Sequence, residues 1–228
     1  ADDEAAAEPL AALDAAPGPA AKAAPANVPV HFVDEFNTNT RGLPADPNAA
    51  HEPRHGRSDG VFFIYHGNGF QGQNVHPIAS DSTCEVVGRV LSTDPRKTTS
   101  WAASVVRQAE PHRGFVVRID QKGELFLEPN RYPGGKAFLK IDPRIGPITH
   151  PAIKPGAGYN KLQLVMKGRD LVILVNGVQV CRPLTFDYDL TPARLSLAAA
   201  GPGMKRAEFD RIEIREIVDS KPVEAKAK

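Results

Sequence analysis

The chain has 228 residues, a formal net charge of +1 and 41% hydrophobic residues, values typical of one folded domain with a full core. Because the charges are nearly balanced, the composition does not favour a nucleic acid partner. No apolar run approaches the ~20 residues that cross a bilayer, so we expect no membrane insertion within this chain. Cys84 and Cys181 are too few for a disulfide framework. Each lies in or beside an apolar run, which favours two unpaired thiols, while one bridge between them stays open.

The two ends of the chain have a composition that cannot form a core. Residues 1–27 are rich in alanine and proline and contain no aromatic residue, and residues 220–228 are short and polar. We expect both segments to be disordered, the first as a flexible linker to a membrane anchor or another domain. The chain starts with Ala rather than Met, which a removed signal peptide or excision from a longer protein would explain. We therefore expect an extracytoplasmic domain (periplasmic, secreted or cell-surface) over residues 28–219.

The middle of the chain has the pattern of an antiparallel β-protein. Short segments rich in Val, Ile, Leu and Phe alternate with turn residues. Hairpin turns are indicated at Lys122-Gly123, Gly168 and Asn176-Gly177. The pattern predicts an all-β fold, an antiparallel two-sheet β-sandwich of the jelly-roll type. The expected strands are residues 28–36, 60–67, 83–92, 100–108, 114–120, 123–129, 160–168, 170–177, 193–201 and 207–217.

One short motif suggests a metal site. Residues 51–55, HEPRH, match the H-E-x-x-H pattern of zinc proteases. The pattern requires a helix, and Pro53 with the glycines and prolines on both sides excludes a helix of useful length. We expect polar loops at 37–60 and 67–77 that form one rim of the domain. Scattered surface imidazoles are favoured there over a metal site, and the histidines concerned are His51, His55, His66 and His76.

The C-terminal half resembles a known family. The segments GFVVRIDQKGELFLEP, YNKLQLVMKGRDLVILVNGVQV, ARLSLAAAG and AEFDRIEIREI, in this order, resemble the concanavalin A-like lectin/glucanase family. They are most similar to its laminin-G-like bacterial modules of the non-catalytic type, over roughly residues 30–218. The marks are Asn160-Lys-Leu, Asn176-Gly177, Gly201 and Phe209-Asp210, with FVDEF at 32–36 as the opening strand. The resemblance implies the sandwich fold and makes sugar the default ligand class.

The same family includes enzymes, which suggests a catalytic alternative. Family 16 glycoside hydrolases carry E-x-D-x-(x)-E, and EFDRIE supplies Glu208, Asp210 and Glu213. Glu208 and Asp210 share a face of a strand, whereas Glu213 joins them only through a β-bulge. The hydrolases carry the motif in a mid-chain strand and this chain carries it in the last one. The opening signature of the 3-keto-disaccharide hydrolase domain is also missing from EFNTNTRGLP, so we expect no catalysis through this motif.

A binding surface is predicted instead on the concave sheet. Sugar recognition needs an aromatic face and fixed polar groups, which Trp101, Arg107, Arg118 and Tyr132 would supply. The alternative is that Trp101 belongs to the core and the arginines are solvated. No cofactor is demanded, although a Ca²⁺ ion between Asp34 and Asp210 would suit the fold.

The leading hypothesis is therefore a non-catalytic module on a flexible tether that recognises a carbohydrate or another surface. Its partner would be a polysaccharide, a glycoconjugate or a protein surface. The first alternative is a glycoside hydrolase of the concanavalin A-like fold, similar to family 16 or to the 3-keto-disaccharide hydrolases. The second is a structural or protein-interaction domain of a larger bacterial protein.

Overall fold

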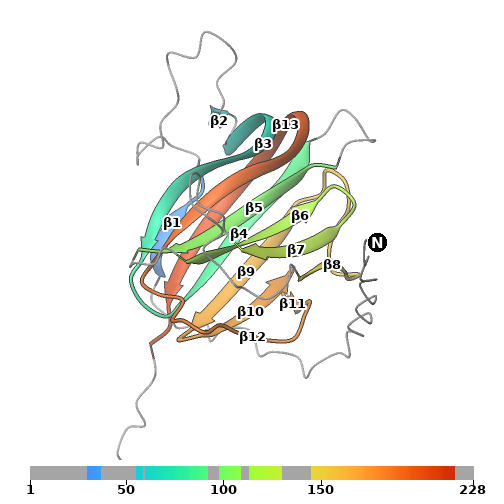
Figure 1. Cartoon of the computed structure of the whole chain (residues 1–228). Coiled ribbons are helices and arrows are strands. Elements are labelled where there is room, and N and C mark those ends of the chain that lie inside the picture. The colour runs from blue at the N-terminus through green and yellow to red at the C-terminus, as the bar shows by residue number, and fades with distance from the viewer. Residues whose placement is uncertain are drawn as a thin grey trace, which may run out of the picture.

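The computed structural model describes residues 30–36, 55–58, 60–91, 98–108, 113–129 and 145–218. The predicted linker at 1–27, the tail at 220–228, His51 and Tyr132 lie outside these residues. Within the described ranges every regular element is a strand, which confirms the all-β prediction (Figure 1). None of these residues forms a helix that is long and apolar enough to cross a membrane.

Thirteen strands are formed in the described part of the chain. They are β1 (Val30–Asp34), β2 (His55–Ser58), β3 (Val61–Ile78), β4 (Ser82–Leu91), β5 (Ser100–Arg107), β6 (Gly114–Asp120), β7 (Glu124–Pro129), β8 (Ile145–Thr149), β9 (Asn160–Lys167), β10 (Asp170–Val175), β11 (Val178–Gln179), β12 (Leu184–Thr185) and β13 (Ala193–Glu216).

Two long strands connect the layers of the sandwich. β3 and β13 pair antiparallel from Ile78 opposite Ala193 to Phe62 opposite Phe209, and Figure 1 shows them side by side across the molecule. The first half of β13 also pairs with β5, which continues through β6 and β7 to β8. The second half pairs with β4, which continues through β9 and β10 to β11. Two antiparallel sheets therefore face each other, which confirms the predicted jelly-roll sandwich.

The core lies between these two sheets and follows the alternation of the strands. Along β9, buried and partly exposed residues alternate over seven positions, from Asn160 to Met166, as expected for a strand with one face on the core. Trp101 of β5 is only 1% exposed and meets the ring of Phe209 edge to face, with 6.0 Å between ring centroids. Gly88 of β4 leaves room for this indole, because a Cβ there would lie 2.9 Å from Trp101 Cε3.

The predicted turns are confirmed by the backbone. Asn176 and Gly177 have φ values of 52° and 83°, the pair of positive angles that a type I′ hairpin requires. The Asn176 side chain also fixes neighbouring segments. Its Nδ2 donates to the Ala152 carbonyl at 2.7 Å and to Asn160 Oδ1 at 3.0 Å, and its Oδ1 accepts the Lys161 amide at 2.9 Å.

Three sequence predictions about local structure were wrong. Residues 67–77 are not a loop but part of β3, and the segments expected as two strands at 193–201 and 207–217 form one strand, β13. Register shifts at Leu195/Ser196, at Pro202/Lys205 and at Phe209/Arg211 let β13 continue through glycine and proline. Long-range pairing with β3 therefore overrides the local turn composition. Residues 55–58, which were expected within the loop at 37–60, form the short strand β2.

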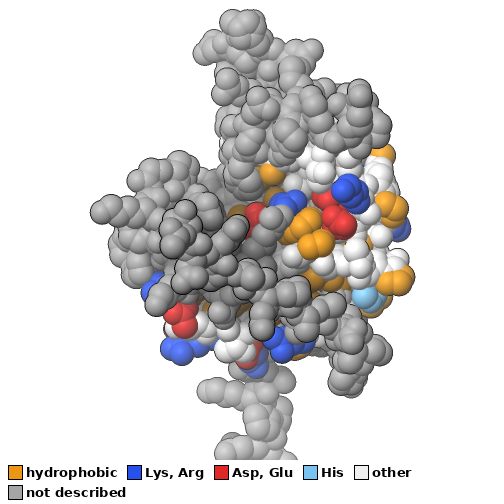
Figure 2. Space-filling model, turned by 45° about the vertical axis from the view of Figure 1, so that its right-hand side comes forward, with side chains coloured by type: hydrophobic (Ala, Val, Ile, Leu, Met, Phe, Trp, Pro, Cys, Tyr) orange, Lys and Arg blue, Asp and Glu red, His pale blue; other side chains and the backbone are white. Residues whose placement is uncertain are grey.

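Charged side chains of both signs are interspersed on the surface. The face shown in Figure 2 has blue and red side chains close together, in keeping with a formal net charge of +1. Among the described residues on that face, no field of a single sign stands out.

Candidate functional site

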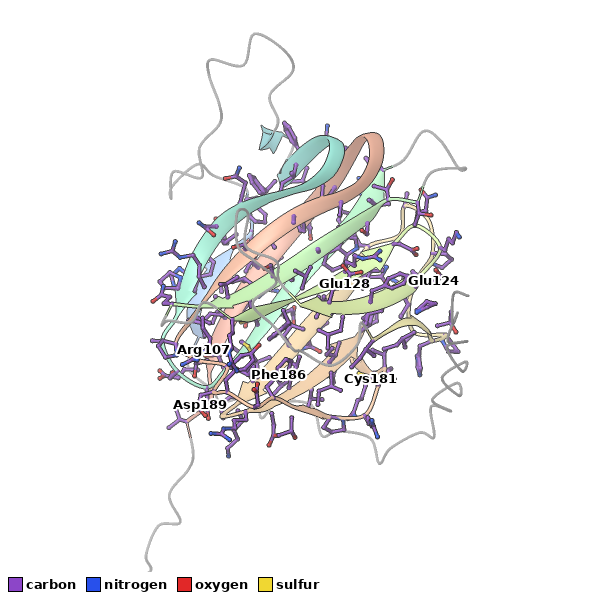
Figure 3. All side chains as sticks on the ribbon, viewed as in Figure 1. Arg107, Glu124, Glu128, Cys181, Phe186 and Asp189 are labelled. Atoms are coloured by element: carbon purple, nitrogen blue, oxygen red, sulfur yellow. The ribbon has the colours of Figure 1, made fainter. Side chains whose placement is uncertain are left out.

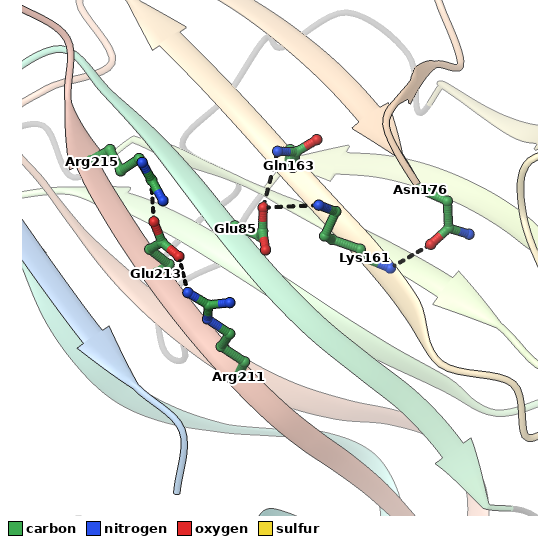
Figure 4. A network of polar contacts seen from close by, with 7 residues as sticks. All are labelled: Glu85, Lys161, Gln163, Asn176, Arg211, Glu213 and Arg215. Carbon is green, nitrogen blue, oxygen red and sulfur yellow. Dashed lines mark hydrogen bonds and ion pairs between the residues drawn. The ribbon is translucent and has the colours of Figure 1, made fainter. Parts of the chain in front are cut away.

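Two carboxylates stand opposite each other on the outer face of one sheet. Glu85 of β4 is the register partner of Glu213 of β13. Their chain neighbours Cys84, Val86, Ile212 and Ile214 are buried in the core, so alternation directs both glutamates outward. Directly opposite residues of antiparallel strands have Cα atoms about 4.5–5.5 Å apart. Figure 4 shows the two side chains on adjacent strands with the polar groups around them.

Glu213 is held by two arginines of its own strand. Its Oε2 accepts a hydrogen bond from Arg211 Nη2 and its Oε1 accepts one from Arg215 Nε (Figure 4). The glutamate is only 3% exposed, whereas the arginine side chains are 38% and 34% exposed. Both carboxylate oxygens are therefore fixed, and two positive charges offset the negative charge.

Glu85 has a different environment, built by β9. Its Oε2 accepts a hydrogen bond from Gln163 Nε2 at 3.0 Å and lies 3.4 Å from Lys161 Nζ. Lys161 is 42% exposed, so its charge is partly screened by water. Oε1 of Glu85 takes part in none of these contacts. One carboxylate of the pair is thus clamped on both oxygens by guanidinium groups, and the other is held on one oxygen only.

The predicted motif residues occupy one surface but do not gather. The register shift at Phe209/Arg211 is the β-bulge that Glu213 needs to share the outer face with Glu208. Glu208 is opposite Arg89 and Glu213 is opposite Glu85, four ladder positions further along. Four positions correspond to roughly 13 Å between Cα atoms along a strand, which is more than the distance between the two carboxyl groups of a glycosidase. Asp210 lies at the bulge and is exposed.

Glu208 forms a polar cluster of its own. It binds Arg89 at 2.6 Å and Arg206 at 2.7 Å. The Arg89 guanidinium lies 4.4 Å from the centre of the Tyr159 ring, and that of Arg206 lies 4.5 Å from the Phe63 ring. Burial raises the pKa of Tyr159 above its usual value, and the positive charge of Arg89 opposes this rise. An aromatic ring and fixed charges therefore lie on the same sheet face as the carboxylate pair.

The predicted sugar-binding residues lie apart. Trp101 lies in the core, which was the predicted alternative to a sugar-binding role. Arg118 is on the outer face of the other sheet, where its guanidinium binds Glu128 Oε1 at 3.0 and 3.1 Å and lies 3.8 Å from the Phe126 ring centre. Arg107 is at the end of β5, 5.7 Å from the Tyr188 ring centre. The structure does not bring these three side chains together, and Tyr132 is outside the described residues.

The calcium prediction concerns Asp34 and Asp210, and Asp34 of β1 is the register partner of Ile212 in β13. Asp34 Oδ1 accepts the backbone N–H of Phe36 at 2.8 Å. No three His, Cys, Asp or Glu side chains gather as a metal site within the part of the chain that the structure describes.

Of the predicted rim histidines, His76 stacks on Phe32 with 4.1 Å between ring centroids. Cys84 and Cys181 are both free thiols, the first buried and the second partly exposed.

Comparison with known proteins identifies the fold. No family model and no curated protein matches the chain. Among solved structures, an endo-acting O-glycanase of the human gut microbiota that initiates mucin breakdown superposes with a TM-score of 0.59 at 10% identity, over 83% of this chain and all of that one. A non-specific endo-β-1,3(4)-glucanase of family GH16 superposes with a TM-score of 0.56 at 13% identity, over 84% and 92%. The fold is that of the concanavalin A-like glucanases. The κ-carrageenase of Pseudoalteromonas carrageenovora also matches, with a TM-score of 0.55 at 12% identity, over 86% and 98%.

These likenesses overturn the leading functional prediction. The superposed proteins are described as enzymes that cut polysaccharides or mucin glycans, so the fold points to the glycoside hydrolase alternative rather than to a non-catalytic module. At these identities the comparison establishes the fold, and any activity has to be argued from the residues of this chain.

Sequence reasoning missed Glu85. The motif search considered carboxylates along one strand, whereas Glu85 and Glu213 meet across two strands that are more than a hundred residues apart. A weak signal was present: Glu85 is the only charged residue in the run TCEVVG, where an isolated acid on an apolar strand marks a polar position on the outer face.

Proposed function

We propose that this chain is a glycoside hydrolase that cleaves a polysaccharide with Glu85 and Glu213 as its two carboxylates. The observation that carries the proposal is their direct cross-strand pairing on one outer sheet face. Glycosidases require two carboxyl groups on either side of the scissile bond, about 5–5.5 Å apart in retaining enzymes. Directly opposite residues have Cα atoms about 4.5–5.5 Å apart, so two side chains that extend in parallel place their carboxyl groups in this range. Glu208 and Glu213 are four ladder positions apart, about 13 Å at the backbone.

The partners of each glutamate assign the roles. Glu213, with both oxygens fixed by Arg211 and Arg215, is the carboxylate that attacks the anomeric carbon. Glu85, bound through one oxygen only, is the acid that gives its proton to the departing glycosidic oxygen. The first step thus forms a glycosyl ester on Glu213 and releases the shortened chain as an alcohol. In the second step, water gives a proton to Glu85 and attacks the anomeric carbon, which frees Glu213 and the second product.

A polymer suits the position of this pair better than a small sugar does. Both glutamates lie on the outer face of a sheet, along which an extended chain can bind across several strands. Tyr159 and the Glu208 cluster lie further along the same face and offer a ring for stacking and charged donors for hydroxyl groups. Because polysaccharides do not cross membranes, an extracytoplasmic location, proposed from the sequence, agrees with this substrate class.

The test is an activity screen with matched variants. The purified chain is incubated with laminarin, lichenan, κ-carrageenan and mucin O-glycans, and released reducing ends are measured. On the substrate that is cleaved, Glu85→Gln and Glu213→Gln each lower kcat by about 10²–10⁴-fold, the usual contribution of an acid–base or nucleophilic group. Glu128→Gln is the control and should leave kcat unchanged, because it removes a glutamate that binds an arginine, Arg118, on the outer face of the other sheet.

The stereochemistry of the product gives a second readout. Proton NMR of the first product formed should show retention of the anomeric configuration, as expected from a close carboxylate pair. Inversion of the configuration, or full activity in Glu85→Gln and Glu213→Gln, would contradict the assignment of this pair. Lack of hydrolysis on every substrate would favour the structural or protein-interaction alternative.

A further inference from the structure

A tyrosine and an arginine contact each other on the same outer sheet face as the carboxylate pair. Gly88 and Asn160 form the last pair of the ladder between β4 and β9. Arg89 follows the first of them and Tyr159 precedes the second, and the Arg89 guanidinium lies 4.4 Å from the centre of the Tyr159 ring. A Cβ at Gly88 would point at Trp101 in the core, and Asn160 is only 2% exposed. Alternation therefore directs both Arg89 and Tyr159 outward.

The register of the strands gives the distance between this contact and the carboxylate pair. Arg89 lies four residues from Glu85 along β4, and Tyr159 lies four residues from Gln163, the register partner of Glu85. Four residues of a strand span roughly 13 Å. A single sugar ring bound at the carboxyl groups cannot cover that distance, so only an oligosaccharide of several units contacts both places.

The Tyr159 ring is held in place by its neighbours. Arg89, which lies over the ring, is itself bound by Glu208, whose Oε2 accepts a hydrogen bond from Arg89 Nε at 2.8 Å. Tyr159 stays partly exposed, so a ligand can reach it. Burial raises the pKa of Tyr159 and the charge of Arg89 opposes this rise, so the phenol keeps its proton at neutral pH. Such a side chain offers an apolar surface to the C–H groups of a sugar and a donor to its oxygens.

We infer that Tyr159, oriented by Arg89, is a second sugar-binding subsite that holds a unit of the polymer about 13 Å from the bond that is cut. The inference rests on the proposed function. A polymer that passes between the two carboxyl groups reaches Tyr159 obliquely across β4, over the pair formed by Val87 and Lys161. Lys161 is 42% exposed and can donate to hydroxyl groups on this path. Affinity should therefore increase with the length of the saccharide.

The experiment measures oligosaccharide binding to the full chain by titration calorimetry, with Glu85→Gln present throughout to prevent turnover. The ligands are the disaccharide and the hexasaccharide of the polymer that the activity screen identifies or, if none is cleaved, those of laminarin, lichenan and κ-carrageenan. Tyr159→Ala removes the ring, Tyr159→Leu fills its space without an aromatic face, and Tyr159→Phe keeps the ring. Glu128→Gln is the control, because Glu128 lies on β7 of the other sheet, where it binds Arg118 at 3.0 Å (Figure 3).

The hexasaccharide should bind about tenfold more tightly than the disaccharide, and Tyr159→Ala and Tyr159→Leu should remove most of this gain, because an aromatic anchor is lost. Tyr159→Phe should keep most of the gain and Glu128→Gln all of it. An equal gain with and without the ring overturns the subsite, even where the chain cleaves the polymer. A gain that requires the ring, in a chain that cleaves nothing, supports the subsite and contradicts only the hydrolase activity. Absence of binding of every oligosaccharide overturns the subsite.

Discussion

Glu85 lies directly opposite Glu213 across β4 and β13, so two acidic side chains share one outer sheet face. Such like-charge pairs normally cost stability. Here three cations, Arg211, Arg215 and Lys161, surround the pair and offset that cost. The opposed pair, rather than either acid alone, is therefore the basis of the proposed assignment.

The first prediction concerns the stability of the carboxylate variants. Glu85→Gln removes one member of the like-charge pair and keeps a side chain that can bind Gln163, so we expect the free energy of unfolding to rise by about 0.2–1 kcal/mol. Glu213→Gln leaves two arginines without their acid and should lower it by about 1–3 kcal/mol, because hydrogen bonds to a buried charged group are lost. Urea unfolding measures both. A loss of stability in Glu85→Gln as large as that in Glu213→Gln would show that Glu85 is chiefly a structural ion-pair partner.

The second prediction concerns the fit of the single tryptophan. A Cβ at Gly88 would lie 2.9 Å from Trp101 Cε3 and 3.2 Å from Phe209 Cδ1. Neither ring can move without disturbing the core, so Gly88→Ala should destabilise the fold by about 1–3 kcal/mol and change the fluorescence of Trp101. Gly158→Ala is the control, because its Cβ would meet only the flexible Lys154 side chain and a carbonyl, at 3.2 Å or more. Equal stability of the two variants would contradict the tight packing between Gly88 and Trp101.

The third prediction concerns the hairpin after β10. Asn176→Gly keeps a residue that tolerates positive φ but removes three side-chain hydrogen bonds, to Ala152, Asn160 and Lys161. At about 0.5–1.5 kcal/mol for each of the three bonds, the loss should be about 1.5–4.5 kcal/mol in urea unfolding. Asn176→Asp keeps the acceptor for Lys161 but turns a carboxylate oxygen toward the Ala152 carbonyl and Asn160 Oδ1, so it should lose at least as much. A loss below about 0.5 kcal/mol in Asn176→Gly would mean that backbone conformation alone holds this turn.

The sequence was sufficient for the strands that alternate locally and for the turns that need special residues. β9 and the Asn176-Gly177 hairpin were predictable because each carries its own signal within a few residues. The continuity of β3 and β13 was not predictable, since Gly and Pro around Pro202 are compatible with a strand only when the paired strand is present.

The candidate site was predictable only in part. Glu213 was found through its motif, and the need for a β-bulge at Asp210 followed from the period of two along a strand. Its partner Glu85 depends on which strands are neighbours, and nothing within either segment determines that. The same holds for Arg107, whose contact with the Tyr188 ring requires the loop between β12 and β13 to lie against the end of β5.

The last prediction concerns the two thiols and alkaline pH. Burial raises the pKa of Cys84 from its ordinary value of 9.0 to about 12 and that of Cys181 to about 11. Between pH 9 and these values the unfolded chain gives up thiol protons that the folded chain retains, so the folded state is destabilised as the pH rises. Each thiol contributes a slope of at most about 1.4 kcal/mol per pH unit, and the stability it provides is fully present below pH 9.

Replacement of both cysteines with alanine isolates this contribution. The unchanged chain and the Cys84→Ala, Cys181→Ala variant are unfolded in urea at several values between pH 8 and pH 11. Deletion of the buried Cys84 side chain lowers the stability of the variant at pH 8. The difference between the two chains should shrink as the pH rises, because only the unchanged chain has thiols to titrate, whereas Tyr188 titrates in both. A constant difference over this range would mean that the thiols ionise as readily in the folded state as in the unfolded one.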